Sequence, residues 1–176
     1  MDTITDTEKK ISLCLEASLI HKKIRRDLKD YIKENMYLKD ICYFIENKIR
    51  MYSSNQLNDG IAFPTGLCLN HIAAHWTPLQ NSTEQFRSDD ILKIDFGVHI
   101  NGIIIDSAFT IKGKTVDTRY DSVIDASKDA VYSIIKHIGV GTRVNELGQI
   151  CEEVVNSYET ELNGIFTPVK TLKQLY

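Results

Sequence analysis

The sequence predicts an α+β fold in which helices cover the apolar face of an antiparallel sheet. Three observations predict this class. Two stretches with helical spacing of apolar residues come first, and two apolar strands joined by an Asn-Gly pair follow. Further helical stretches and a second Asn-Gly pair then complete the 176 residues, in which no internal repeat is evident.

The composition is that of an ordinary globular chain, with 43% apolar residues. The net charge of -3 argues against nucleic acid as the main partner, because phosphate binding needs a clustered excess of Lys and Arg. No stretch approaches the ~18 apolar residues of a membrane span, so we expect no membrane partner. The four cysteines show no C-x-x-C spacing, which favours reduced thiols and a cytoplasmic location.

Two helices are predicted near the N-terminus. The first begins at Thr5 or Thr7 and runs to about Glu34, because apolar residues recur at helical spacing along it. We expect His21, in its middle, to lie at the surface. The second helix covers residues 38–52, where apolar residues form one stripe.

The middle of the chain carries the predicted sheet. A strand is expected around Ile61–Phe63, and an extended segment covers Leu67–Ala74. A polar excursion then runs from Thr77 to Asp90. The central hairpin spans Ile91–Ile111 and turns at Asn101-Gly102, because both positions of a two-residue turn require φ > 0.

The predicted turn places two carboxylates on one face of this hairpin. If Ile100 faces Ile103, then Asp106 lies opposite Gly97, and Asp95 is its diagonal neighbour at about 7–8 Å. Two acids this close repel each other and lose hydration, which favours a divalent cation between them. The alternative is that both acids are solvated on the open face of an antiparallel sheet.

Three histidines lie close to the acid pair in the sequence. His71 and His75 are four residues apart, so a two-histidine zinc motif is one interpretation. Pro64 and Pro78 argue against a regular helix there, and the favoured interpretation places His75 alone near the acids. His71 receives no role. His99 is expected to be a partly exposed histidine near the hairpin turn rather than a metal ligand.

Two helices and a hairpin are predicted in the C-terminal third. The first helix starts at Asp117 or Thr118 and ends at about His137, and Thr142 is expected to cap the second helix. A hairpin over Tyr158–Lys170, with its own Asn-Gly turn, ends the chain. The residues of the first helix that are predicted to face inward are Val123, Ala126, Ala130, Val131, Ile134, Ile135 and Ile138.

Four separated runs of this sequence resemble the type 2 methionine aminopeptidases. They occur in the family's order and at matching spacing, from about Leu57 to Lys170, and the type 1 enzymes usually carry different residues around the histidine. The runs are Phe63-Pro64-Thr65-Gly66, Ala73-Ala74-His75-Trp76-Thr77-Pro78, Lys93-Ile94-Asp95-Phe96-Gly97 and Ile104-Ile105-Asp106-Ser107-Ala108-Phe109.

The resemblance implies roles for four residues of these runs. Asp95 and Asp106 match the first two ligands of a pair of divalent metal ions, which are cobalt, manganese, iron or zinc. His75 matches a catalytic histidine that contacts the scissile peptide and is attacked by the family's covalent epoxide inhibitors. Phe63 matches a wall of the substrate pocket that holds the methionine side chain.

The resemblance also implies a fold and a domain organisation. The family has a pita-bread fold in which two α+β halves enclose the metals. Residues 1–56 then correspond to N-terminal helices, and residues 57–176 to the N-terminal half of the catalytic domain. The family takes three more ligands, one His and two Glu, from a C-terminal half that has no counterpart in this sequence.

The function that the resemblance implies is removal of the initiator methionine from nascent proteins, whose N-terminal peptide is the substrate. With two of the five ligands, we expect this chain alone to be inactive, and the missing C-terminal half is its expected partner. One alternative is a non-catalytic binding protein on the same fold, like the proliferation-associated relatives. Another is a prolidase-type peptidase, which the runs around Phe63 and His75 make less favoured.

Overall fold

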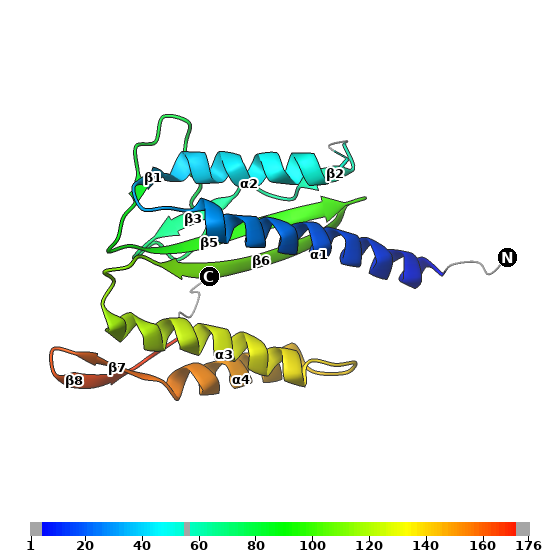
Figure 1. The fold of residues 1–176 in the computed structure, drawn as a ribbon. Coiled ribbons are helices and arrows are strands. Elements are labelled where there is room, and N and C mark those ends of the chain that lie inside the picture. Colours follow the sequence, from blue (N-terminus) through cyan, green and yellow to red (C-terminus); the bar gives the residue numbers. More distant parts are fainter. Residues whose placement is uncertain (1–4, 55–56, 172–176) are drawn as a thin grey trace. The chain divides into compact units, whose positions relative to one another are not determined.

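A computed structural model of the chain describes residues 5–54 and 57–171. They form two compact units, unit 1 over Met1–Val116 and unit 2 over Asp117–Tyr176. Figure 1 labels the helices and strands of both units. The predicted division between residues 1–56 and 57–176 concerns the organisation of the catalytic domain and stays a prediction. Within the described ranges, no helix is long and apolar enough to cross a membrane.

Unit 1 begins with two helices, α1 (Asp6–Tyr31) and α2 (Leu38–Tyr52). Thr5 caps α1 through a capping box, because its hydroxyl accepts a hydrogen bond from the Glu8 amide while the Glu8 carboxylate accepts one from the Thr5 amide. Thr5 is therefore the cap among the two predicted candidates, although α1 ends three residues earlier than expected. The bounds predicted for α2 are confirmed.

The central hairpin consists of β5 (Ile91–Ile100) and β6 (Ile103–Lys112). Ile100 pairs with Ile103 and Gly97 with Asp106, as the two-residue turn predicts. Asn101 and Gly102 have φ angles of 48° and 76°, in the left-handed region that such a turn requires. The register of the hairpin is therefore confirmed.

Four short strands complete the sheets of unit 1. The strands β2 (Asp59–Ile61) and β3 (Gly66–Leu69) both pair antiparallel with β5, while β6 occupies the other side of β5. Separately, β1 (Met36–Tyr37) pairs with β4 (Gln85–Phe86). The extended segment predicted to reach Ala74 ends early, because Asn70 adopts a left-handed φ of 47° and turns the chain.

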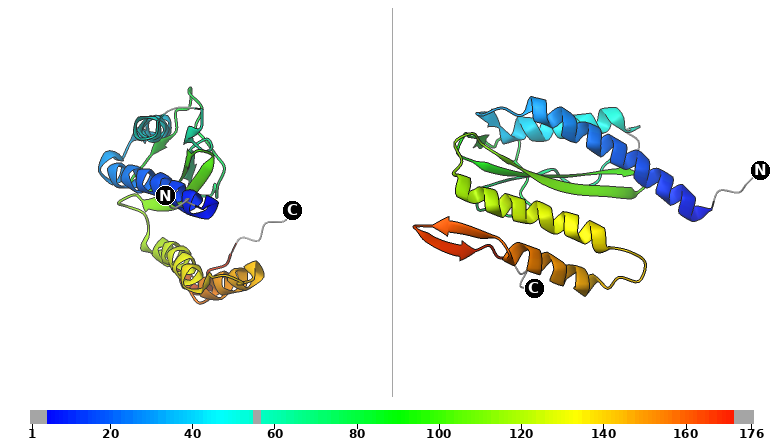
Figure 2. Two further views of the ribbon diagram at one scale, coloured as in Figure 1. Left: turned by 90° about the vertical axis from the view of Figure 1, so that its right-hand side faces the viewer. Right: turned by 60° about the horizontal axis from the view of Figure 1, so that its bottom comes forward.

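The helices α1 and α2 lie side by side on one face of the hairpin (Figure 2), and the core of unit 1 lies between them and the sheet. His21 belongs to this core with 4% of its surface exposed, so its predicted surface position is wrong. The buried face of α1, which packs on the sheet, includes His21 between Ala17 and Ile24. The buried residues of the core are Ala17, Ile24, Leu28, Leu38, Ile41, Cys42, Ile45, Ile49, Leu67, Phe86, Leu92, Ile94, Phe96, Val98 and Ile100.

Unit 2 contains a 3-10 turn, two helices and a hairpin. They are η1 (Thr118–Tyr120), α3 (Asp121–His137), α4 (Val144–Asn156), β7 (Glu159–Leu162) and β8 (Ile165–Pro168). The turn between β7 and β8 lies at Asn163 and Gly164, as predicted, and both residues have positive φ angles.

The predicted caps of unit 2 need correction. Asp117 caps the 3-10 turn that precedes α3, through a hydrogen bond from the Arg119 amide to its carboxylate. Thr142 does not cap α4. Its hydroxyl instead accepts a hydrogen bond from the Gly139 amide, at 3.0 Å, and donates one to the His137 carbonyl, at 3.3 Å. It therefore closes the C-terminal end of α3, where free carbonyls need donors.

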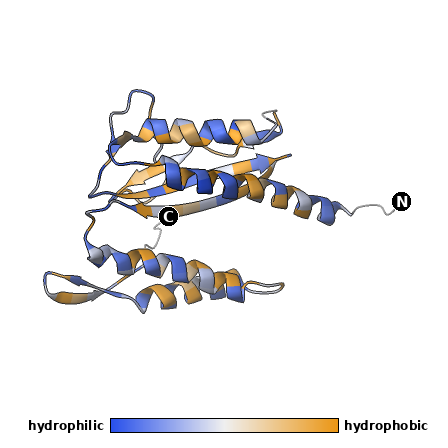
Figure 3. Cartoon of the chain, in the orientation of Figure 1, coloured by the Kyte–Doolittle hydropathy of each residue, from blue (hydrophilic) through white to orange (hydrophobic). Residues whose placement is uncertain are grey.

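The buried cluster of unit 2 is small and comprises Ala126, Ala130, Val155 and Val169. Of the residues predicted to face inward from α3, the two alanines are buried, whereas Val131 and Ile135 are 55% and 61% exposed. Figure 3 shows apolar residues along both helices of this unit. The predicted inward face of α3 is therefore wrong for most of its large residues.

Candidate active site

Asp95 and Asp106 project from the same face of the β5–β6 hairpin, opposite the core. Asp95 pairs with Ala108 and Asp106 with Gly97, so the two acids are diagonal neighbours as predicted. Asp95 is half-buried, and among the described residues its Oδ1 atom has no hydrogen-bond partner. Burial, followed by the negative charge of Asp106, raises the pKa of Asp95 above its ordinary value.

A cavity of about 380 Å³ opens over the two acids. Phe63 and His75 line the same cavity, so the structure brings together all four residues that the sequence singled out. Sequence reasoning gave no role to three other lining residues. These are Pro64, Gly66 and Thr77, and their membership of the two recognised runs was the available signal.

Phe63 reaches the site because Gly97 has no side chain. A Cβ atom at Gly97 would lie 2.4 Å from Cε1 of Phe63 and 2.9 Å from Cβ of Ala62, which are distances that real atoms do not reach. The Ala62 amide also donates to the Gly97 carbonyl at 3.0 Å. The glycine of the Lys93–Gly97 run therefore allows the aromatic wall of the cavity to lie against β5.

His75 lies in a loop that is tied to β3 at the next residue, Trp76. The Leu67 amide donates to the Trp76 carbonyl at 2.9 Å, and the Trp76 amide donates to the Cys68 thiol sulfur at 3.4 Å. His75 itself is exposed and has a left-handed φ of 62°, which is uncommon for a non-glycine residue. Such strained backbone is often found at functional sites, and here it accompanies a side chain that lines the cavity.

The remaining histidines do not contribute to this cavity. His71 is exposed on the loop and is not among the described lining residues, so the two-histidine zinc interpretation gains no support. The loop is also not helical, as the prolines indicated. His99 is half-buried and pairs with Ile104 close to the turn, as expected for a histidine at the end of a hairpin.

The acid pair fits part of a divalent metal site. Carboxylate oxygens are preferred ligands of hard cations, and a buried carboxylate oxygen without a hydrogen-bond donor is suited to coordinate one. Across residues 5–54 and 57–171, no three or more His, Cys, Asp or Glu side chains gather as a ligand group. The described chain therefore offers two ligands from a shared face and not a complete site.

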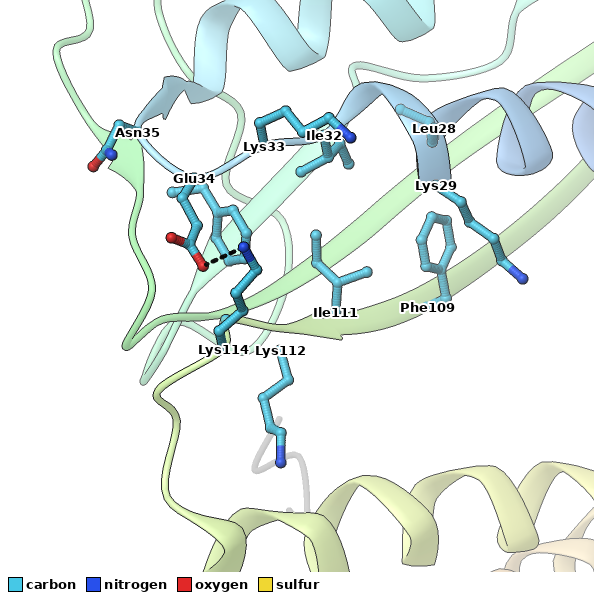
Figure 4. Close-up of a pocket in the computed structure, with 12 residues that line it drawn as sticks. Leu28, Lys29, Ile32, Lys33, Glu34, Asn35, Phe109, Ile111, Lys112 and Lys114 are labelled. Carbon is cyan, nitrogen blue, oxygen red and sulfur yellow. Dashed lines mark ion pairs between the residues drawn. The ribbon is translucent and has the colours of Figure 1, made fainter.

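A larger cavity of about 630 Å³ lies elsewhere in unit 1, between the C-terminal part of α1 and the end of the hairpin (Figure 4). Lysines surround its apolar floor. Among the described residues that line it, the one carboxylate is Glu34, which forms an ion pair with Lys114 at 3.9 Å, and no histidine is present. This cavity lacks the acid pair and the histidine that line the smaller cavity.

The fold and the acid pair define a class of protein. Residues 12–171 match the model of metallopeptidase family M24, and the chain belongs to that family. Family membership indicates the use of divalent metal ions. The half pita-bread fold predicted from the sequence is confirmed.

Within this class, the chain is similar to methionine aminopeptidases of type 2. It is 43% identical over 158 residues to methionine aminopeptidase 2 of Clavispora lusitaniae, covering 89% of this chain and 36% of that protein. It is 41% identical over 161 residues to methionine aminopeptidase 2A of Arabidopsis thaliana, covering 91% and 36%. The resemblance found in the sequence is confirmed, and the chain spans about a third of the length of these relatives.

Solved structures share the fold at lower sequence identity. Methionine aminopeptidase from Thermotoga maritima superposes with a TM-score of 0.75 at 19% identity, covering 89% of this chain and 63% of that one. Prolidase from Pyrococcus furiosus superposes with a TM-score of 0.73 at 19% identity, covering 88% and 44%. Because a methionine aminopeptidase and a prolidase superpose with similar TM-scores, the fold alone does not indicate which of the two activities is present.

Proposed function

We propose that this chain supplies the N-terminal half of the active site of an enzyme that removes the initiator methionine from nascent proteins. The observation that carries the proposal is the shared cavity of Phe63, His75, Asp95 and Asp106. This cavity occurs in a chain that is 43% identical over 158 residues to a methionine aminopeptidase 2. The substrate in this proposal is the N-terminal peptide of a nascent chain in the cytoplasm, and neither nucleic acid nor a membrane takes part.

In this proposal Asp95 and Asp106 hold two divalent ions together with one His and two Glu from a C-terminal half. The ions are cobalt, manganese, iron or zinc, and when bound they supply Lewis-acid activation of water and of the peptide carbonyl. The raised pKa of Asp95 and its unpartnered oxygen support this role, because a cation relieves both the repulsion and the missing hydrogen bond. A non-catalytic binding protein would gain nothing from such an acid pair.

The other two residues act on the peptide. Phe63 forms an apolar wall beside the acids and contacts the methionine side chain, and its position depends on Gly97. His75 hydrogen-bonds the reacting peptide as charge develops on it. The hydrogen bonds that tie the His75 loop to β3 support this role, because a group that stabilises developing charge must be held in place beforehand.

Two experiments test the proposal. First, the 176-residue chain is supplied with cobalt or manganese and a Met-Ala-Ser peptide. We expect no sustained turnover, because two of five ligands give weak metal affinity. Second, residues 12–171 replace the matching segment of methionine aminopeptidase 2 from Candida albicans, which is 44% identical over 158 residues. We expect this chimera to release methionine.

Matched variants of the chimera make the second experiment specific. Asp95→Asn should lower methionine release by at least about 100-fold, because it removes a proposed ligand. Lys29→Ala, which lies at the other cavity, should leave release unchanged. A folded chimera without activity, or an active Asp95→Asn chimera, would contradict the proposal. Hydrolysis of dipeptides that end in proline, in place of methionine release, would favour the prolidase alternative.

A further inference from the structure

His21 is a buried polar residue on the opposite side of the sheet from the acid pair. It lies on α1, 75 positions before Phe96, and 4% of its surface is exposed. Its ring stacks on the Phe96 ring with centroids 4.0 Å apart and planes within 5°. Its Nε2 atom lies 3.0 Å from the Phe96 carbonyl oxygen. Because a carbonyl oxygen only accepts, Nε2 carries the hydrogen and donates it.

An aliphatic residue would fill this position on the core stripe at lower cost. The neighbours of His21 on the same stripe of α1 are Ala17, Ile24 and Leu28, all fully buried. Burial lowers the pKa of His21, and interactions with the backbone of Phe96 and Ser107 oppose this effect only in part. The side chain therefore bears a desolvation cost that packing alone does not require.

The contacts of His21 fall on the residue pair that connects the two acids. Phe96 follows Asp95 directly, Ser107 follows Asp106 directly, and Phe96 pairs with Ser107 across the two strands. Side chains of neighbouring residues point to opposite faces of a strand. A group on the core side that fixes the backbone of Phe96 and Ser107 therefore also fixes the backbone positions from which the Asp95 and Asp106 side chains project into the cavity.

We infer that His21 is a positioning residue for the two carboxylates, through its hydrogen bond to the Phe96 carbonyl and its stacking on the Phe96 ring. The inference rests on the proposed function, because it assigns Asp95 and Asp106 to metal binding. Metal ligands must be held close to their productive geometry by the residues behind them, and such supporting groups affect affinity strongly. His21 performs this role from a helix distant in sequence.

The test uses the 176-residue chain with Mn²⁺ alone as the probe. Paramagnetic broadening of backbone amide signals near Asp95 and Asp106 reports even weak binding. His21→Phe keeps an aromatic ring but removes the donor, and we expect it to weaken Mn²⁺ binding by about 10-fold. His21→Gln retains an amide donor and should bind within about threefold of the wild-type chain. Ile24→Val, on the same stripe of α1, is the control for a general loss of core packing.

Amide hydrogen exchange supplies a second measurement that requires no metal. In His21→Phe, the exchange of Phe96 and Ser107 should accelerate by about 10-fold relative to the Leu92–Ile111 pair of the same hairpin, because local support is lost. Ile24→Val should change both pairs alike. Unchanged exchange at Phe96 and Ser107 in His21→Phe, or the same local pattern in Ile24→Val, would overturn the positioning role.

The two measurements also separate this inference from the proposed function. If Asp95→Asn leaves the broadening unchanged, the proposed metal role of the acids fails, while exchange still decides whether His21 fixes the strand pair. If His21→Phe accelerates exchange but binds Mn²⁺ as the wild-type chain does, positioning of the carboxylates for metal is overturned. Local acceleration together with weaker binding, both absent from Ile24→Val, supports the inference.

Discussion

The two units of this chain bury their apolar residues to very different extents. In unit 1, two helices and a sheet enclose fully buried aliphatic side chains such as Ile45 and Ile94. In unit 2, the described core is limited to two alanines and two valines, while Ile135 remains 61% exposed. Helical spacing of apolar residues therefore shows which face can be buried, but burial also requires a second apolar surface opposite it.

The largest expected effect is the difference in free energy of unfolding between isoleucine-to-alanine substitutions in the two units. Ile45→Ala should lower the free energy of unfolding by about 2–5 kcal/mol, because it opens a cavity in a closed core. Ile135→Ala should change it by no more than about 0.5 kcal/mol, because that side chain is mostly exposed. Urea unfolding measures both values.

Two signals assign each value to its unit. Trp76 is the one tryptophan in the sequence and lies in unit 1, so its fluorescence follows that unit, while circular dichroism follows the helices of both. An equal loss of stability in the two variants would break the comparison. It would mean that the apolar face of α3 is covered in solution, as its sequence pattern predicts.

Local signals in the sequence predicted much of the fold. The register of the central hairpin followed from Asn101-Gly102 alone, because a two-residue turn leaves one pairing. The bounds of α2 followed from one continuous apolar stripe. The buried position of His21 could not be predicted this way, because α1 carries two competing apolar stripes. One of them, through Leu15 and Leu19, is exposed, and the sheet selects the other.

The candidate site was predicted to a similar extent and for the same reason. Asp95 and Asp106 share a face because strand alternation and one turn place them there. The approach of His75 and Phe63 to these acids depends on loops whose conformation is set by tertiary contacts. Examples are the contact of Trp76 with the Cys68 sulfur and that of Phe63 with Gly97, which has no side chain. Residue spacing does not predict such contacts, so the roles of His75 and Phe63 were predicted from the family resemblance alone.

An intermediate effect is expected from adding one methyl group to a glycine in each unit. Gly97→Ala should lower the free energy of unfolding by about 1–3 kcal/mol, because its Cβ would overlap Phe63 and Ala62. Gly148→Ala, in α4 with nothing within 4 Å of the added atom, should raise it by about 0.5–1 kcal/mol through helix propensity. Thermal unfolding of both variants measures the two signs.

The glycine variants also bear on the cavity. Displacement of Phe63 by Gly97→Ala should be visible as changed aromatic proton shifts of Phe63, which Gly148→Ala should not produce. If Gly97→Ala were neutral and left those shifts unchanged, the close packing of Phe63 on β5 would be wrong. The aromatic wall of the proposed methionine pocket would then lose its structural basis.

The smallest effect concerns charge rather than packing. Without metal, Asp95→Asn should raise the stability of the chain at neutral pH by no more than about 1 kcal/mol. The substitution removes a half-buried charge and one partner of a repelling pair, and solvent partly screens both effects. Asp125→Asn in unit 2 removes an exposed ion pair with Lys128 and should instead lower stability by roughly 0.2–1 kcal/mol. Urea unfolding with and without Mn²⁺ measures both.

The pH dependence gives the sign of the Asp95 effect independently. The pKa of Asp95 is raised in the folded chain, so between its ordinary value and the raised value the folded state binds more protons than the unfolded state. Stability is therefore lost as pH rises through that window, and Asp95→Asn should remove this part of the slope. An unchanged slope in the variant would show that the pKa of Asp95 is not raised in the folded chain. Added Mn²⁺ should make the wild-type chain more stable than Asp95→Asn, because the ion stabilises only the chain that keeps both acids.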